Sequence, residues 1–154
     1  KAEIIAKMNS LVDPEIIKLL YLASQTGVKI SLIIRGICCL VPQRKNLSEN
    51  ITVISIIGHF LEHSRIFWFS NNNDPEVYIG SADWMRRNLD RRIEAVTPIE
   101  DLKLKSRLYN LLQIYINDDY YSWIMNEDGY YNKKLISSSK KRSQIDLIKK
   151  WHNY

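Results

Sequence analysis

Two runs of aliphatic and β-branched residues constrain the fold of this chain more than any other feature. Positions 28–36, "VKISLIIRG", and 51–57, "ITVISII", are short and show no helical period, which indicates buried strands. A helix is predicted before the first run, because Asp13 is a good N-cap, Pro14 suits the first helical position and Gly27 can end the helix. Strands that alternate with a helix in this way are typical of an α/β domain.

Most of the remaining chain divides into further strands and helices. In chain order these segments are strand 65–70, strand 76–81, strand 91–99, helix 100–118, hairpin 120–134 and helix 137–154. The turn clusters "NNNDP" and Asp-Gly separate strands that can pair, and the first of the two helices has an amphipathic pattern. The first residues, "KAEIIAKMNSLVDPE", resemble helical sequence.

Composition favours one compact domain with a substantial core. The chain has 154 residues, of which 45% are hydrophobic and 25% charged. We expect a central mixed β-sheet flanked by helices over residues 1–128. A basic C-terminal extension over residues 129–154, with a hairpin strand and a helix at its end, should follow.

Charge and hydropathy narrow the choice of partners and compartment. The net charge of +5 favours polyanions such as nucleic acid, nucleotides, polyphosphate or an acidic membrane surface. No apolar run approaches the ~18 residues of a membrane span, and the first residues lack the apolar region of a secretory signal. Cys38 and Cys39 are adjacent and follow a strand, so we expect packed free thiols in a reducing cytoplasm.

Several residues that could bind a ligand or take part in a reaction lie near His63, at the predicted start of a strand. Arg65 lies two residues further on and therefore on the same face of that strand. Ser81, after Gly80, would lie beside them if the two strands pair across the asparagine turn. Glu94 could then reach the imidazole from the next strand and set its tautomer. Such an assembly would hold a phosphoryl group, with His63 as acid, base or nucleophile.

This arrangement resembles the half-site of the phospholipase D superfamily, which is His-x-Lys, then Asp, then Gly-Ser-x-Asn and a downstream Glu. The residues that match it are His63, Gly80, Ser81 and Glu94. The departures are Arg65 in place of Lys, Ser70 in place of Asp and Asp83 in place of Asn. These departures argue against ordinary phosphodiester hydrolysis.

Longer motifs are similar to one branch, the C-terminal domain of the bacterial polyphosphate kinase family. They are "NSLVDPEIIKLLYLASQTGVKISLIIRGICCL", "LSENI", "HFLEHSRIFWF" and "VYIGSADWMRRNLDRRIE", and the resemblance covers roughly residues 1–128. It implies an enzyme that transfers the terminal phosphate of ATP reversibly to inorganic polyphosphate (EC 2.7.4.1). The transfer would pass through a phosphohistidine on a preceding domain, so this chain alone should be inactive.

The resemblance also assigns roles to individual residues. Arg35, in "IIRGICCL", matches the arginine that binds nucleotide phosphate, and a guanidinium can hold two phosphate oxygens. His63, in "LEHSR", matches the second active-site histidine, which contacts nucleotide phosphate and acts as general acid. The expected catalytic residues are His63 and Glu94, and the expected ATP- or phosphate-binding residues are Arg35, His63, Arg65, Ser81 and Arg91.

Other features stay open or are read as structural. Four arginines, Arg86, Arg87, Arg91 and Arg92, could line a polyphosphate channel, although on a strand only alternate ones would point inward. His59 has no third ligand that would complete a zinc site and is expected at the surface. The tryptophans Trp68, Trp84 and Trp123 are expected in the core or an interface.

Cofactor and partners follow from the same resemblance. Mg²⁺ should bind with ATP, mainly through the phosphates and the other domains, without a metal ligand in this chain. The expected partners are ATP or ADP, polyphosphate, the preceding domains of the chain and further copies of the full enzyme. No nucleic acid and no transmembrane segment are expected, and the location should be cytoplasmic or peripheral to the inner membrane. Two alternatives are a homodimeric phosphodiesterase or nuclease half-site, and a non-catalytic polyanion-binding module.

Overall fold

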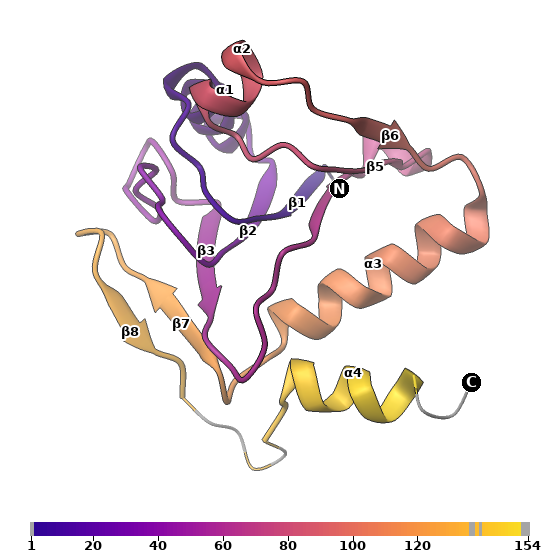
Figure 1. Cartoon of the computed structure of the whole chain (residues 1–154). Coiled ribbons are helices and arrows are strands. Elements are labelled where there is room, and N and C mark those ends of the chain that lie inside the picture. Colours follow the sequence, from indigo (N-terminus) through magenta and orange to yellow (C-terminus); the bar gives the residue numbers. More distant parts are fainter. Residues whose placement is uncertain (1, 136–137, 139, 152–154) are drawn as a thin grey trace.

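The computed structural model describes residues 2–135, 138 and 140–151, and its centre is an eight-stranded mixed β-sheet (Figure 1). The strands lie side by side in the order β6-β5-β4-β1-β2-β3-β7-β8. Their bounds are β1 Glu3–Met8, β2 Lys29–Ile34, β3 Ile51–Ile56, β4 Arg65–Phe69, β5 Glu76–Gly80, β6 Val96–Pro98, β7 Ser122–Met125 and β8 Tyr131–Lys133.

Strand directions bring four chain segments to one edge of this sheet. β1, β2 and β3 run parallel, whereas β4 is antiparallel to β1 and β5 is antiparallel to β4. The carboxyl ends of β1, β2 and β5 therefore lie at the same edge as the beginning of β4. This edge is called the active edge below, because the predicted site residues follow or precede these strand ends.

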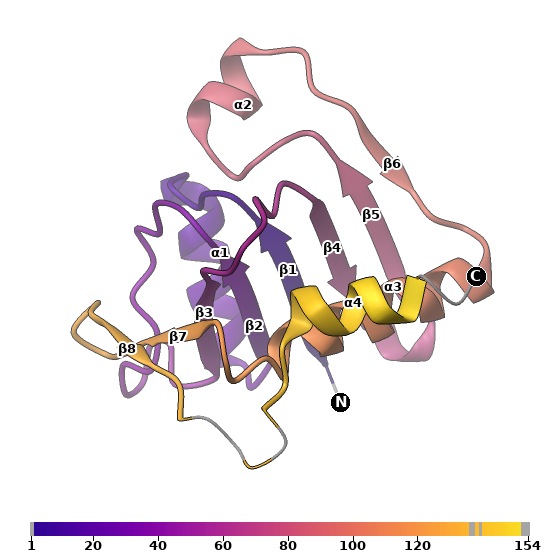
Figure 2. The same cartoon turned by 60° about the horizontal axis from the view of Figure 1, so that its bottom comes forward.

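Helices cover both faces of the sheet (Figure 2). Helix α1, Pro14–Gln25, begins at its N-cap Asp13, whose side chain accepts a hydrogen bond from the backbone of Ile16, and it packs one face through Leu20. Helix α3, Leu102–Ile116, and helix α4, Ser143–Trp151, pack the opposite face. Burial of apolar side chains between each helix layer and the sheet supplies the main stabilisation of such a fold.

The N-terminal residues form the strand β1 at the centre of the sheet, so the expectation of helical sequence there is wrong. Ile5 is fully buried in the cluster beneath α3, and Ala6 is fully buried in the cluster beneath α1. A central strand is apolar on both faces and lacks a polar alternation. A short run of this kind cannot be distinguished from a helix by periodicity alone.

The strand predicted over residues 91–99 is also wrong in its first half. Helix α2 spans Arg86–Arg91, and the strand β6 is limited to Val96–Pro98 at the sheet edge. Short edge strands that contain proline are common, because the edge leaves one backbone donor position unused. The arginines of α2 therefore do not alternate between two faces of a strand.

The remaining predicted elements are present, but the last helix begins later than predicted: α4 begins at Ser143, and the described residues 138 and 140–142 before it are not helical. The helix predicted over 100–118 is α3, which begins after its N-cap Asp101. The predicted hairpin is the antiparallel pair β7–β8, with Gly129 at φ 84 in the turn. Residues 129–154 supply β8 and α4, while the predicted caps Ser137 and Ser139 lie outside the described residues. None of the helices in the described part of the chain has the length and apolarity needed to cross a membrane.

Candidate active site at the edge of the sheet

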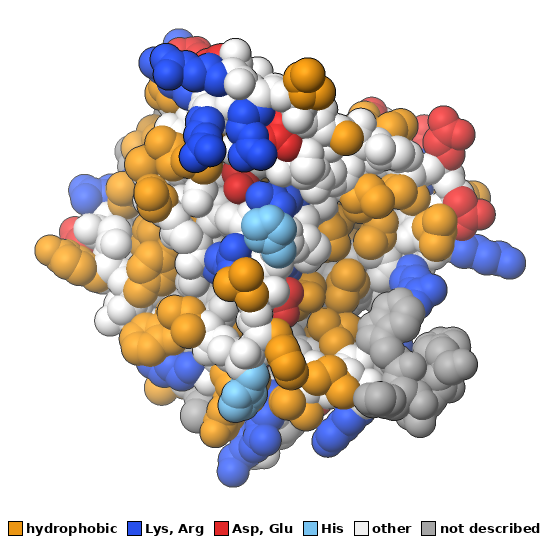
Figure 3. Space-filling model, in the orientation of Figure 1, with side chains coloured by type: hydrophobic (Ala, Val, Ile, Leu, Met, Phe, Trp, Pro, Cys, Tyr) orange, Lys and Arg blue, Asp and Glu red, His pale blue; other side chains and the backbone are white. Residues whose placement is uncertain are grey.

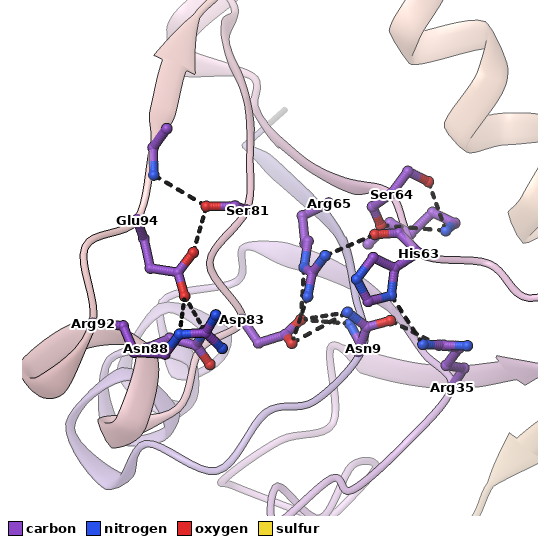
Figure 4. Close-up of polar contacts among 12 residues, drawn as sticks. Asn9, Arg35, His63, Ser64, Arg65, Ser81, Asp83, Asn88, Arg92 and Glu94 are labelled. Atoms are coloured by element: carbon purple, nitrogen blue, oxygen red, sulfur yellow. Dashed lines mark hydrogen bonds and ion pairs between the residues drawn. The ribbon is translucent and has the colours of Figure 1, made fainter.

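The predicted site residues meet at the active edge of the sheet. Figure 3 shows a histidine near the middle of one molecular face, next to basic side chains, with more Lys and Arg side chains gathered above it. Figure 4 shows the polar side chains in two neighbouring groups, one around His63 and one around Glu94. The first group links segments that are as many as 74 residues apart in the chain.

Arg35 and His63 are in contact at the centre of the first group. Arg35 directly follows β2, and its Nη2 lies 3.2 Å from Nδ1 of His63, which precedes β4. A guanidinium can only donate hydrogen bonds, so Nδ1 accepts in this contact and the neutral imidazole carries its hydrogen on Nε2. His63 is exposed, and its Nε2–H can therefore be offered to a ligand.

Asn9, the residue after β1, holds Arg35 in this orientation. Its Oδ1 accepts a hydrogen bond of 2.7 Å from Arg35 Nε. Its backbone N and its side-chain Nδ2 donate to the carboxylate of Asp83, at 2.7 Å and 3.2 Å to Oδ1. Both Asn9 and Asp83 are buried, so these bonds are shielded from competition by water.

Arg65 closes these contacts into a ring. Its Nε and Nη2 donate to the two oxygens of Asp83, at 3.2 Å and 3.0 Å, and its Nη1 donates to the backbone O of His63 at 3.0 Å. The ring thus runs from His63 through Arg35, Asn9, Asp83 and Arg65 back to His63. Five side chains from different parts of the chain hold one another in place.

Arg65 and Asp83 form an ion pair that explains two of the departures from the superfamily pattern. Their side chains are only 11% and 9% exposed. Burial by itself would raise the pKa of Asp83, but the hydrogen bonds from Arg65 and from Asn9 outweigh it, and the pKa lies below its ordinary value. Arg in place of Lys and Asp in place of Asn are thus partners in a single contact.

Glu94 belongs to the second group and does not contact His63, which corrects the expected orienting bond. Its carboxylate accepts hydrogen bonds from Ser81 Oγ and Asn88 Nδ2, and Arg92 Nε lies 3.5 Å from Oε1. The hydrogen bonds from Ser81 and Asn88 lower the pKa of the Glu94 carboxyl. Ser81 also accepts from the backbone of Ala95, so Glu94 fixes the Ser81 hydroxyl and the chain between α2 and β6.

Ser70 and the arginines of α2 are not part of the ring around His63 or of the contacts around Glu94. Ser70 follows β4 at the opposite edge of the sheet, where its hydroxyl accepts a hydrogen bond of 2.8 Å from the backbone of Glu3. Arg86, Arg87 and Arg91 are exposed on α2, next to the second group. They extend the positive charge of the active edge towards solvent.

Most residues expected to be structural are so, but Cys39, which was expected to pack, is exposed. His59 is exposed and lies edge-on against Tyr121, with ring centroids 5.6 Å apart. Trp84 stacks on Phe67 at a centroid distance of 5.1 Å. Burial raises the pKa of the Cys38 thiol to about 11, which keeps it protonated and unreactive near neutral pH.

Three residues at the active edge, Asn9, Lys7 and Asn88, were missed in the sequence. Asn9 and Lys7 belong to the segment whose strand was not recognised, and Lys7 is a buried lysine, only 2% exposed, within β1. Had "EIIAKM" been identified as a strand, Asn9 would have stood at its carboxyl end beside Arg35 of the next parallel strand. That position is the signal that could have found it.

The acidic side chains at the active edge do not form a metal site. Within residues 2–135, 138 and 140–151, no three His, Cys, Asp or Glu side chains are placed to hold a metal ion. Asp83 binds Asn9 and Arg65, and Glu94 binds Ser81 and Asn88. The chemistry of this edge is that of an anion site built from guanidinium and imidazole donors.

Comparisons with known proteins agree with this description. A polyphosphate kinase from Prochlorococcus marinus is 62% identical over 148 residues, which are 95% of this chain and 21% of that protein. The crystal structure of polyphosphate kinase from Porphyromonas gingivalis has a TM-score of 0.93 and 39% identity, covering 99% of this chain and 24% of that one. The chain therefore spans about a fifth of the length of the curated relative it matches.

A more distant structure has the predicted phospholipase D-like fold. Nuc from Salmonella typhimurium, a phospholipase D family member, has a TM-score of 0.58 and 19% identity over 75% of this chain and 78% of its own. At this identity the likeness concerns the fold alone. The family model described as polyphosphate kinase C-terminal domain 2 matches residues 1–144. With the polyphosphate kinase relatives and the phospholipase D-like sheet, this match establishes that the chain belongs to the polyphosphate kinase C-terminal domain 2 family.

Proposed function

We propose that this chain is the C-terminal part of the active site of a polyphosphate kinase. The full protein transfers the terminal phosphate of ATP reversibly to inorganic polyphosphate, through a phosphohistidine on a preceding domain. Family membership supports this activity, and the observation that carries the proposal is the contact between Arg35 and His63 at the active edge. His63 is exposed beside Arg35, and both belong to a preorganised ring of donors, which is what binding of a phosphate chain requires.

Arg35 binds a nucleotide phosphate in this proposal, and His63 contacts the same group. When the terminal phosphoryl group leaves ATP, negative charge grows on the oxygen that joined it to the β-phosphate. Arg35 can stabilise that charge through the N–H groups that Asn9 does not use. Neutral His63 donates its Nε2–H to a phosphate oxygen. To donate a proton outright the ring must be doubly protonated, so Arg35 must first leave Nδ1 and turn to the phosphate.

The other predicted residues position the site or add positive charge to it. Arg65 uses three of its donors within the ring and therefore positions Asp83 and the backbone of His63. Glu94 orients Ser81, whose hydroxyl hydrogen is already engaged, at the border of the site. Arg91 is exposed, and with Arg86, Arg87 and Arg92 it provides charge for the polyphosphate chain.

Cofactor and partners are proposed on the same basis. Mg²⁺ enters with the ATP phosphates and neutralises part of their charge, and ligands from this chain are not assigned to it. The partners are ATP or ADP, polyphosphate, the remaining domains of the same protein and further copies of it. The proposed location is the cytoplasm, and we also propose peripheral association with the inner membrane.

The proposal is tested by comparing His63→Ala with His59→Ala in the full-length protein. Loss of a general acid lowers turnover by about 10² to 10⁴, and we expect that range for His63→Ala. His59→Ala is the matched control, because His59 lies on the same segment and its ring packs against Phe60 and Tyr121. Steady-state polyphosphate synthesis measures the effect, and melting temperatures show that both variants fold. Undiminished synthesis by His63→Ala would refute the assigned role.

A further inference from the structure

His63 lies on a connection without regular secondary structure, yet its surroundings hold it firmly. Residues 57–64, here called the histidine loop, join β3 to β4. Phe60 and Leu61 of this loop are exposed and contribute little packing. The position of His63 must therefore be set by polar contacts to other parts of the chain.

Lys7 binds both chain neighbours of His63. Its Nζ lies 3.3 Å from Oε2 of Glu62, and it donates to Oγ of Ser64 at 2.9 Å and to the Ser64 carbonyl at 3.4 Å. The ammonium also lies 4.9 Å from the ring centre of Tyr115. Lys7 belongs to the central strand β1 and is almost fully buried, so it anchors the loop to the least mobile part of the sheet.

Gln144 of α4 holds the loop from the other side. Its Oε1 accepts from the backbone N of Phe60 at 3.0 Å, and its Nε2 donates to the backbone O of Phe60 at 2.8 Å and to Oε1 of Glu62 at 3.1 Å. Tyr115 of α3 donates to the other oxygen of Glu62 at 2.9 Å. The amide of Gln144 thus pairs with Phe60 as the backbone of a neighbouring strand would.

Gln144 lies very close to Gly58 of the histidine loop. A Cβ added at Gly58 would overlap the amide of Gln144, so this glycine permits the close approach. A cavity of about 10 Å³ is lined by Lys7, Arg35 and Glu62 among other residues, and that volume is about the minimum for one water molecule.

We propose that Lys7, Glu62 and Gln144 are positioning residues for His63. They form a clamp, here called the loop clamp, that places the imidazole against Arg35; this role rests on the proposed phosphoryl-transfer function. Strand β1 sets both halves of the site, because Lys7 holds the histidine loop and Asn9, two residues later, holds Arg35. Alternate strand residues lie on one face about 6.7 Å apart, which gives the two catalytic side chains a common rigid support.

The experiment uses the full-length protein and compares Gln144→Ala with Leu147→Ala. Gln144→Ala removes three hydrogen bonds to the histidine loop without leaving a charge unpaired. Leu147 lies on the same helix and packs against the core beneath α3, so Leu147→Ala loosens α4 but leaves the three hydrogen bonds of Gln144 in place. Rates of polyphosphate synthesis are measured with both ATP and polyphosphate varied, below the melting temperature of each variant.

We expect Gln144→Ala to lower kcat by about 10-fold to 10²-fold with a much smaller change in KM, since misplacing a reacting group by about 1 Å has such effects. Leu147→Ala should keep the parental kcat even where its melting temperature is lower. Nitrogen NMR of the imidazole provides a readout that a general loss of stability does not move. In the parent His63 should show the tautomer with hydrogen on Nε2, and in Gln144→Ala this signature should give way to a mixture.

Gly58→Ala disturbs the same loop clamp through a substitution in the histidine loop. The added methyl group displaces the Gln144 amide from Phe60, so this variant should lose kcat as Gln144→Ala does. In the double variant Gly58→Ala/Gln144→Ala the obstructing amide is absent, and the loss should be no greater than that of Gln144→Ala alone. Multiplication of the two single losses would mean that the residues act independently and would overturn the clamp.

Two failures can be told apart. A parental protein without ATP-dependent polyphosphate synthesis would contradict the proposed function itself. An active parent in which Gln144→Ala and Gly58→Ala match Leu147→Ala in kcat and in the His63 signal would leave that function intact and refute the positioning role.

Discussion

Arg35 illustrates how a single side chain depends on geometry as well as charge. Its Nε binds Asn9 while Nη2 faces His63, and a planar guanidinium makes both contacts at once. A lysine would keep the charge but not these two directions. The proposed contribution of Arg35 to phosphate binding therefore depends on the fork shape of its guanidinium, which Asn9 aligns.

We expect Arg35→Lys to impair polyphosphate synthesis by the full-length protein despite the conserved charge. Loss of one hydrogen bond to a charged group costs about 1.5 to 3 kcal/mol, which corresponds to about 10-fold to 10²-fold in rate. Arg44→Lys is the control, because Arg44 is half exposed and only pairs with Asp128 at 3.7 Å. Equal rates for the parent and Arg35→Lys would show that charge alone suffices.

We expect the contribution of Asp83 to the free energy of unfolding to depend on pH. Its pKa is lower in the folded chain than in the unfolded chain, so its stabilisation is complete above the unfolded value and is lost as pH falls through the folded one. Asp83→Asn removes the charge and leaves Arg65 without its ion-pair partner. We expect a loss of about 3 to 5 kcal/mol at neutral pH, as is typical when a buried pair is broken.

The test is urea unfolding of the parent and of Asp83→Asn at several pH values. The difference between their unfolding free energies should be constant near neutrality and should shrink below about pH 4, where an unfolded aspartate takes up its proton. Glu94, whose pKa is also lowered, titrates in both proteins and cancels in the difference. A difference that stays constant down to about pH 2 would contradict the assigned ion pair.

Among the secondary structure elements, α2 has the composition of a polyanion-binding surface. Arg86, Arg87 and Arg91 project from this short helix, and Arg92 follows it beside Glu94. Because these side chains are exposed, their attraction for a phosphate chain is screened by salt. The helix therefore suits transient contacts along a polymer better than tight binding of one phosphate.

We expect polyphosphate to bind the 154-residue chain weakly, with an affinity that falls steeply as salt rises. The double variant Arg91→Ala/Arg92→Ala should weaken binding and reduce the slope of log affinity against log salt by about 1 to 2, since each phosphate contact releases counterions. Fluorescence anisotropy with labelled polyphosphate at several salt concentrations measures both quantities.

The control for this experiment is Lys45→Ala/Lys103→Ala. It changes the net charge equally, but both lysines are exposed at the opposite edge of the sheet, near the beginning of β3 and beyond the end of β6. Its effect on affinity and slope should be clearly smaller. Equal effects of the two pairs would mean that polyphosphate responds only to total charge and has no preference for α2.

At the scale of the whole molecule, this chain supplies only the phosphate-binding part of the proposed active site. Two hydrophobic clusters, one on each face of the sheet, make the active edge rigid, and the side chains of this edge are suited to bind and polarise phosphate. The group that accepts the phosphoryl group is assigned to a preceding domain. The relatives are about five times as long as this chain, which leaves ample sequence for such a domain.

The isolated chain should therefore show no ATP-dependent polyphosphate synthesis and no acid-labile phosphohistidine. Incubation with ATP labelled at the γ-phosphate, followed by separation under alkaline conditions, measures incorporation. The full-length protein, treated in the same way, is the positive control. Stable label on the isolated chain would place a phosphoryl acceptor within these 154 residues and overturn the division of labour.

Local sequence determined a large part of this protein. The caps of α1, the buried strands β2 and β3, the hairpin β4–β5 and the positions of Arg35 and His63 follow from residues that are close in the chain. N-caps, turn residues and apolar runs act over a few positions, so their effects can be predicted without a three-dimensional model.

Tertiary structure decided which of these residues touch. Asn9 and Asp83 are 74 residues apart, and Gln144 and Phe60 are 84 apart. Glu94 binds Ser81 and not His63, because α2 and the chain after it turn its side chain away from the imidazole. β1 was not recognised because the buried Lys7 interrupts its apolar run, and so short a run cannot be distinguished from a helix by periodicity alone. A hydrogen bond depends on the approach of two segments to within about 3 Å, and only the packed sheet brings these segments together.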